Sequence, residues 1–204
     1  MKNHLIANYE KLYQIKEILD TQNNNYFTTI KINEKELNDN TVSIVMTACN
    51  RSVQTYFTIN TIANSSYKNV QVILVDDSTT DPVTIEKLQE YNIHIELINI
   101  KNKFWVNPCV NYNIGFKHIK GSKVIIQNAE VCHVGDVINY VVNNVNNDEY
   151  HAINVCALMN LSANSALYNI GDMEYSNYDK ITDLCISWWY QHSIHRNEYF
   201  HFLH

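Results

Sequence analysis

Short apolar runs alternate along this chain with segments that have the periodicity of helices. The runs are rich in β-branched residues and predict buried strands at residues 42–48, 70–77 and 122–127, an alternating strand at 93–100 and a further strand at 150–159. Helices are predicted at residues 53–65, 82–91, 107–120 and 135–145. This alternation is typical of an α/β fold with a mainly parallel sheet. Ligands bind such sheets beyond the carboxyl ends of the strands, so the residues that follow each run are the candidates for function.

The first 40 residues are predicted to form a helix and a connector ahead of a domain at 41–204. Apolar residues recur at helical spacing over residues 5–19, which indicates an amphipathic helix. The connector could add a short strand at 26–32. We interpret the helix as a packing or dimerisation element, so a homodimer formed through it is a candidate assembly.

The charge balance argues against some classes of partner. The chain has 15 basic and 21 acidic residues and a formal net charge of −6, whereas general nucleic-acid binders usually carry a basic patch. The sequence contains neither an apolar run long enough to span a bilayer nor a signal-peptide pattern. Its five cysteines form no Cys-x-x-Cys pair. We therefore expect reduced thiols and a cytoplasmic protein.

Polar side chains follow the predicted strands where each one ends. The segments are Cys49-Asn50-Arg51, Asp76-Asp77-Ser78, Lys101 to Trp105 and Asn128-Ala129-Glu130. A nucleotide needs such a mixture, because a carboxylate accepts from a base N–H and a diphosphate needs a divalent cation held by oxygen ligands. The sequence has no glycine-rich phosphate loop of the dinucleotide-binding or P-loop type, which argues against a dehydrogenase or a P-loop NTPase.

Four motifs in this order resemble the family 2 glycosyltransferases, which have the GT-A fold. The segments that carry the resemblance are VSIVMTACNR, VQVILVDDSTTD and NPCVNYNIGFKHIKGSKVIIQNAEV. In the family, one strand ends in Asn-Arg and a second in Asp-Asp-x-Ser-x-Asp, and an Asn-x-Gly helix and an Asp-x-Asp metal motif follow. The resemblance covers residues 42–145 and, more weakly, WWYQHSIHRNEYFHF. It implies a GT-A sheet, mainly parallel and flanked by helices, with an N-terminal helical extension.

The resemblance also implies a nucleotide site in the loops after these strands. The expected nucleotide-binding residues are Ala48, Cys49, Asn50, Arg51, Asp76, Asp77, Asn111 and Asn128, with Asn113 beside them. Asn128 and Glu130 occupy the ends of the Asp-x-Asp motif, where an amide replaces the first carboxylate. Because the family often adds a late histidine to the metal shell, His192 is a third expected ligand of Mn²⁺ or Mg²⁺. No catalytic residue is assigned.

The reaction that the resemblance implies is a metal-dependent transfer of a sugar from a nucleotide sugar to an acceptor hydroxyl, with inversion. We expect a UDP-sugar and a hexosyl or N-acetylhexosaminyl group, whereas the acceptor could be a glycan, a lipid or a protein. The alternative is a non-catalytic module that binds a nucleotide sugar or serves in assembly. A nucleotidyltransferase is less favoured, because its glycine-rich loop with a basic residue is missing after the first strand.

The general base of the family lies late, in a Gly-Phe-Asp segment that an acidic pair follows. Neither feature occurs after residue 183, and Asp179 and Asp183 lie too early to replace it well. Three explanations are open. The chain could be a piece of a longer enzyme, which we favour, a natural short form that binds a donor without efficient transfer, or an enzyme with a different base.

Simpler interpretations exist for several of these residues. Asp76 and Asp77 could merely begin a turn, and Glu130 could be a solvated acid at the end of a strand. We interpret His133 as a helix-entry or packing group. The aromatic segment at 187–196 could equally be core, an interface or a stacking platform for a sugar.

Overall fold

The computed structural model describes residues 2–21, 25–133 and 135–153. The chain divides into two compact units. The first comprises Met1–Tyr56 and Tyr67–Glu130, and the second comprises Phe57–Ser66 and Val131–His204.

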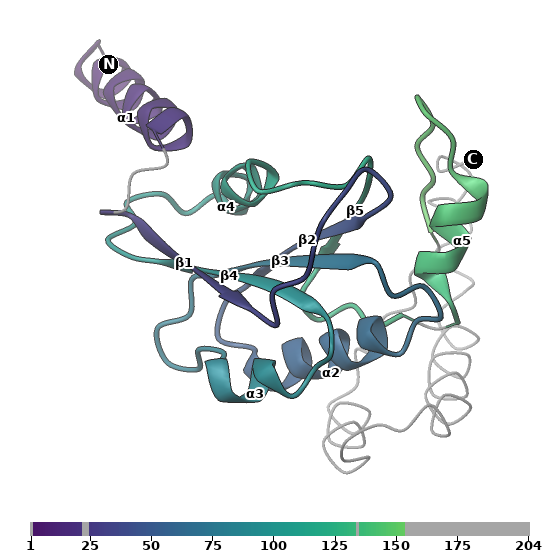
Figure 1. Ribbon diagram of the computed structural model, residues 1–204. Coiled ribbons are helices and arrows are strands. Elements are labelled where there is room, and N and C mark those ends of the chain that lie inside the picture. Colours follow the sequence, from purple (N-terminus) through teal and green to yellow (C-terminus); the bar gives the residue numbers. More distant parts are fainter. Residues whose placement is uncertain (1, 22–24, 134, 154–204) are drawn as a thin grey trace, which may run out of the picture. The chain divides into compact units, whose positions relative to one another are not determined.

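A five-stranded sheet forms the centre of the first unit (Figure 1). Its strands, in the spatial order β1-β4-β3-β2-β5, are β1 (Phe27–Ile32), β4 (His94–Ile100), β3 (Val70–Asp76), β2 (Val42–Ala48) and β5 (Lys123–Asn128). All neighbouring pairs are parallel except β1 and β4, which are antiparallel. The predicted α/β fold with a mainly parallel sheet is confirmed, and the connector does supply a short strand, β1.

The helices lie near the predicted segments. They are α1 (Lys2–Thr21), α2 (Ser52–Ala63), α3 (Ile85–Gln89), α4 (Pro108–Phe116) and α5 (Val137–Asn144). Helix α3 begins later than predicted, after Pro82. Thr84 is its N-cap, and the Thr84 side chain accepts from the backbone N–H of Lys87. In Figure 1, α4 lies over one face of the sheet, and α3 and the start of α2 lie over the other.

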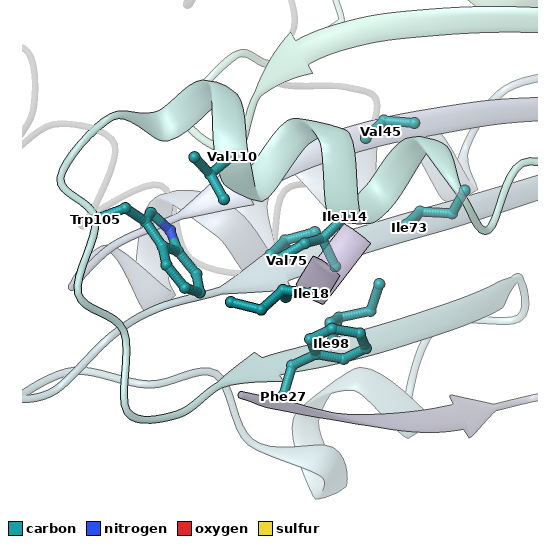
Figure 2. Close-up of a cluster of buried hydrophobic side chains, with 9 residues drawn as sticks. All are labelled: Ile18, Phe27, Val45, Ile73, Val75, Ile98, Trp105, Val110 and Ile114. Atoms are coloured by element: carbon teal, nitrogen blue, oxygen red, sulfur yellow. The ribbon is translucent and has the colours of Figure 1, made fainter. Parts of the chain in front are cut away.

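An apolar core fills the space between α4 and the sheet. Its buried side chains, drawn in Figure 2, are Ile18, Phe27, Val45, Ile73, Val75, Ile98, Trp105, Val110 and Ile114. Gly115 lets α4 approach closely, since a Cβ atom there would lie 2.7 Å from Val45 Cγ1 and 3.2 Å from Val75 Cγ2. The buried side chain of Ile18 shows that the end of α1 packs into this core, which agrees with the interpretation of the helix as a packing element.

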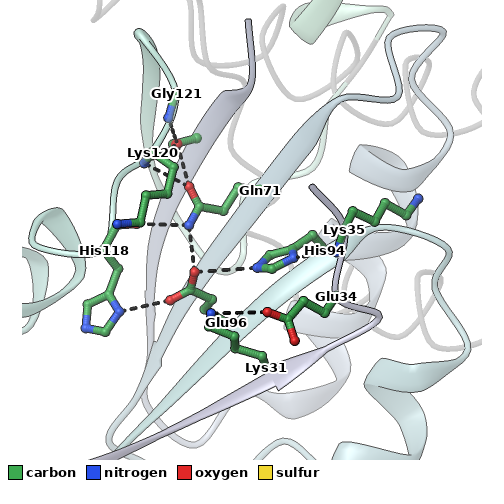
Figure 3. Close-up of polar contacts among 10 residues, drawn as sticks. Lys31, Glu34, Lys35, Gln71, His94, Glu96, His118, Lys120 and Gly121 are labelled. Carbon is green, nitrogen blue, oxygen red and sulfur yellow. Dashed lines mark hydrogen bonds and ion pairs between the residues drawn. The ribbon is translucent and has the colours of Figure 1, made fainter. Parts of the chain in front are cut away.

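A buried polar cluster lies at the opposite end of this sheet face, near the amino ends of β2 to β4. Figure 3 shows the Glu96 carboxylate between two histidines, with His118 Nδ1 at 2.9 Å and His94 Nε2 at 3.5 Å. Gln71 Nε2 donates to Glu96 Oε1 at 2.8 Å. Burial alone would raise the pKa of Glu96, but the hydrogen bonds from His118 and Gln71 lower it below its ordinary value. The cluster therefore holds an ionised carboxylate inside the fold.

Strand β5 differs from the prediction of a buried strand. Among the described strands it lies at the edge of the sheet, and Val124 and Ile126 are 41% and 58% exposed. Residues 150–153 form no strand, and the rest of the strand predicted at 150–159 lies outside the described residues.

The second unit contains α5, which the Asp136 side chain caps by accepting from the backbone N–H of Asn139. Asp136 Oδ1 also accepts from Ser65 Oγ at 2.6 Å. His133 is buried, its backbone N–H donates to Thr61 Oγ1, and burial lowers the pKa of the imidazole to about 4. These features support the interpretation of His133 as a packing group.

Candidate functional site

The carboxyl ends of β2, β3 and β5 lie side by side, as the parallel register requires. Ala48 is paired with Asp76 across β2 and β3, and Thr47 with Asn128 across β2 and β5. The loops that leave these strands contain most of the residues expected to bind a nucleotide. The sheet therefore brings these segments, which are distant in sequence, to one edge.

Asn50 organises the loop after β3. It has a positive φ of 54°, and its Oδ1 accepts from the backbone N–H groups of Thr79, Thr80 and Asp81 at 2.9, 2.8 and 3.2 Å. Its own N–H donates to Ser78 Oγ. Asparagine tolerates this backbone conformation better than most residues. These contacts show that Asn50 stabilises the loop after β3. Contact between its side chain and a nucleotide stays a prediction.

Asp76 is buried and is also committed to the loop. Its two oxygens accept from the backbone N–H groups of Ser78 and Val83 at 2.9 and 3.0 Å. Asp81 then binds both the backbone N–H and the hydroxyl of Ser52, at 2.9 and 2.6 Å, where α2 begins. A carboxylate in this position stabilises a helix N-terminus. Ligand binding by Asp76 likewise stays a prediction.

Asp77, the next residue, is held differently. Its Oδ2 accepts from Lys103 Nζ at 2.5 Å and from Asn111 Nδ2 at 2.8 Å. Trp105 Nε1 in turn donates to Asn111 Oδ1 at 2.8 Å, which fixes the orientation of the amide. Asp77 Oδ1 is buried and has no nitrogen or oxygen donor among the described residues. One acceptor atom is thus left over at the end of β3.

The Asp77 carboxylate and the Cys49 thiol affect each other's pKa. Burial alone would raise the pKa of Asp77, but the hydrogen bonds from Lys103 and Asn111 help to lower it, so the carboxylate is ionised at neutral pH. The Asp77 carboxylate raises the pKa of the neighbouring Cys49 thiol, which is a weak donor toward it. Ala48, at the end of β2, is buried, and its carbonyl accepts from the backbone N–H of Asp77.

The segment after β5 forms a second group of contacts. Tyr112 Oη donates to Asn128 Oδ1 at 2.9 Å and lies 2.9 Å from the carbonyl oxygen of Gln127. Glu130 Oε1 accepts from Arg51 Nη1 at 2.8 Å, an ion pair that joins the loop after β2 to the end of β5. The two ends of the predicted metal motif are therefore engaged by side chains of the chain itself.

Sequence reasoning placed Lys103 and Trp105 among the strand-end candidates without giving either a contact, and it missed Tyr112. Lys103 and Trp105 follow β4, a position that the sheet topology marks for inspection, and Tyr112 directly follows Asn111 in α4. Asn113, expected beside the site, is exposed on α4. His192 and the aromatic segment at 187–196 lie outside the described residues.

The described part of the chain contains neither a candidate metal cluster nor a helix suited to span a membrane. No group of three or more His, Cys, Asp or Glu side chains is arranged there to hold a metal ion. No helix in the same residues has the length and apolar character to cross a bilayer.

Comparison with known proteins shows the family. The model of the glycosyl transferase family 2 matches residues 43–200, which is more than half of the chain. No curated protein matches the sequence. Two crystal structures of S. aureus TarS, one of residues 1–349, are similar at 18% identity and a TM-score of 0.40. Each match covers 45% of this chain, but only 28% and 17% of the respective TarS chains. On the extent of the family match, the chain belongs to the glycosyl transferase family 2.

Proposed function

We propose that the first unit binds the nucleotide of a sugar donor, a UDP-sugar, at the carboxyl ends of β2, β3 and β5. The protein then transfers the sugar, a hexosyl or N-acetylhexosaminyl group, to an acceptor hydroxyl with inversion. Membership of the family supports glycosyl transfer. The observation that carries the nucleotide site is Asp77 Oδ1, a buried oxygen that has no nitrogen or oxygen donor among the described residues.

A buried carboxylate oxygen without a strong donor is costly and native proteins rarely keep one, so a ligand donor is expected at Asp77 Oδ1. Its position beyond a parallel strand is where α/β sheets bind ligands. The carboxylate is ionised, and a hydrogen bond to a charged acceptor is stronger than one between neutral groups. A base N–H that reached Oδ1 would displace the weak thiol donor of Cys49.

The arrangement favours uracil over guanine. The imide edge of uracil has one N–H between two carbonyl oxygens, which matches one acceptor oxygen beside a donor ammonium group. Asp77 Oδ1 and Lys103 Nζ are such a pair. Guanine presents two adjacent N–H donors that suit both oxygens of a carboxylate, and here Oδ2 is already bound by Lys103 and Asn111.

Mn²⁺ or Mg²⁺ is the cofactor expected for this reaction, because divalent ions are common in the family. When bound, such an ion would neutralise charge on the departing nucleoside diphosphate. The predicted ligands that the structure describes fit it poorly. Asn128 and Glu130 supply only one carboxylate between them, since Asn128 is an amide whose Oδ1 accepts from Tyr112, and Glu130 is paired with the cation of Arg51. Hard divalent ions prefer several oxygen ligands, with carboxylates among them.

Calorimetric titration of the full chain with UDP, GDP and ADP tests the nucleotide part of this proposal. We expect UDP to bind more tightly than GDP. Equal affinity for all three nucleotides would leave no role for the base contact to Asp77. Hydrolysis of a UDP-sugar by the same preparation would then distinguish an enzyme from a module that only binds the donor.

A further inference from the structure

The ion pair between Arg51 and Glu130 lies where a divalent ion is expected. Arg51 follows β2, Glu130 follows β5, and these two strands are paired in parallel. Their side chains are 53% and 32% exposed, so both charged groups are accessible to a ligand from solvent. Arg51 Nη1 lies 2.8 Å from Glu130 Oε1, so the permanent positive charge of the guanidinium stands at the end of the metal motif.

Two other anion-binding features at this edge, the N-terminus of α2 and Lys103, are already used within the protein. The Asp81 carboxylate occupies the N-terminus of α2 through Ser52, so a phosphate there would meet a negative charge. Lys103 is held by Asp77, at the base end of the proposed site. Among the described residues that directly follow β2, β3 and β5, Arg51 is the one lysine or arginine, so it is the cation that could receive a diphosphate at these strand ends.

Arg51 can leave Glu130 at little cost. Half-exposed ion pairs contribute little net stability, because water solvates both groups well when they separate. A diphosphate carries more negative charge than one carboxylate, and the planar guanidinium donates two parallel hydrogen bonds to phosphate oxygens. The exchange involves no covalent change.

We propose that Arg51 supplies the cation that binds the diphosphate of the donor, that Glu130 holds Arg51 in place until the donor arrives, and that nucleotide binding consequently needs no divalent metal. This inference rests on the proposed function and specifies the chemistry of the same site. It assigns Glu130 the opposite role from a metal ligand. If Glu130 were a metal ligand, nucleotide binding would require it. If Glu130 competes with the diphosphate for Arg51, it weakens nucleotide binding.

The test is a calorimetric titration of the full chain with UDP, once in EDTA and once in excess Mn²⁺. We expect wild-type affinities in the two buffers to agree within about threefold, since the cation is part of the protein. Arg51→Gln should lose about tenfold or more in affinity, and Arg51→Lys should lose less because it keeps the charge without the planar fork. Glu130→Gln should bind UDP at least as tightly as wild type.

Matched controls are Lys11→Gln and Glu10→Gln, which make the same charge changes at exposed positions on α1 and should leave UDP affinity unchanged. Circular dichroism of each variant shows whether the fold is kept. If UDP binds only with Mn²⁺ and Glu130→Gln abolishes binding, the inference is wrong and the proposed function stands. If wild type binds UDP in neither buffer, the proposed function itself fails, and this inference fails with it.

Discussion

Lys103 Nζ lies 2.5 Å from Asp77 Oδ2, and this contact ties the segment after β4 to the end of β3. It fixes one oxygen of Asp77 and leaves the other for a donor from a ligand. The Lys103 hydrogen bond also lowers the pKa of Asp77 against the opposing effect of burial, so the acceptor keeps its charge. The proposed nucleotide site depends on this pair.

Lys103→Gln should weaken UDP binding by about tenfold, because the site loses a donor and the Asp77 charge loses its partner. The pKa of Asp77 should rise toward or above its ordinary value, since burial then acts with less opposition. Binding needs the ionised carboxylate, so affinity in the variant should begin to fall at a higher pH than in wild type. UDP titrations over an acidic pH series measure this; identical pH profiles would contradict the account.

Cys49 should react slowly with iodoacetamide at neutral pH, because the Asp77 carboxylate and burial raise the pKa of its thiol and the thiolate is the reactive form. Asp77→Asn should accelerate alkylation at Cys49, and UDP should protect it in wild type. Peptide mass spectrometry resolves Cys49 from Cys109, which is also exposed and serves as the internal control. If neither Asp77→Asn nor UDP changed the alkylation rate of Cys49, the thiol would be remote from the site.

Gly115→Ala should destabilise the first unit by about 1–3 kcal/mol, the usual cost of overpacking a core. The new Cβ would meet Val45 Cγ1 at 2.7 Å, and valine is too stiff to move aside easily. Asn113→Ala is the matched control on an exposed position of the same helix and should be neutral or slightly stabilising. Urea denaturation compares the two. Equal or greater stability of Gly115→Ala would mean that α4 is not closely seated on β2.

Glu96→Gln should lower stability at neutral pH by about 1–3 kcal/mol, because the histidine and amide donors lose a charged acceptor inside the fold. The pKa of Glu96 is depressed in the folded state, so its contribution is present above the unfolded pKa and is lost as pH falls through the folded value. The difference between wild type and Glu96→Gln should therefore shrink on acidification below pH 4.5. Glu36→Gln, at an exposed position, is the control. A difference that stays constant with pH would contradict an ionised Glu96.

Much of the fold could be predicted because the signal is local. The runs at β2 and β3 are mostly apolar since both faces of these strands are buried, and the sequence shows that directly. The run at β5 has the same composition, yet Val124 and Ile126 are exposed. Its place at the edge depends on the order of strands in space, and no local pattern encodes that order. The domain boundary near residue 40 and the homodimer through α1 stay predictions.

The site could be predicted in position but not in its contacts. Parallel strands bring their carboxyl ends together, so Asp77 and Glu130 were expected at one edge. Asp76 and Asp77 look alike in sequence, but backbone N–H groups after β3 bind both oxygens of Asp76, whereas the side chains of Lys103 and Asn111 bind one oxygen of Asp77. The pairing of Arg51 with Glu130 joins two loops that are remote in the chain, and only the folded sheet reveals it.

The central claim is that Asp77 accepts a hydrogen bond from the nucleobase, and the affinity of Asp77→Asn for UDP tests it most directly. Asparagine keeps the size of the side chain but removes the charge, and Asp39→Asn makes the same change at an exposed position before β2. Isothermal titration calorimetry should show Asp77→Asn weaker than wild type by about tenfold or more, with Asp39→Asn unchanged. Wild-type affinity in a folded Asp77→Asn protein would contradict the account.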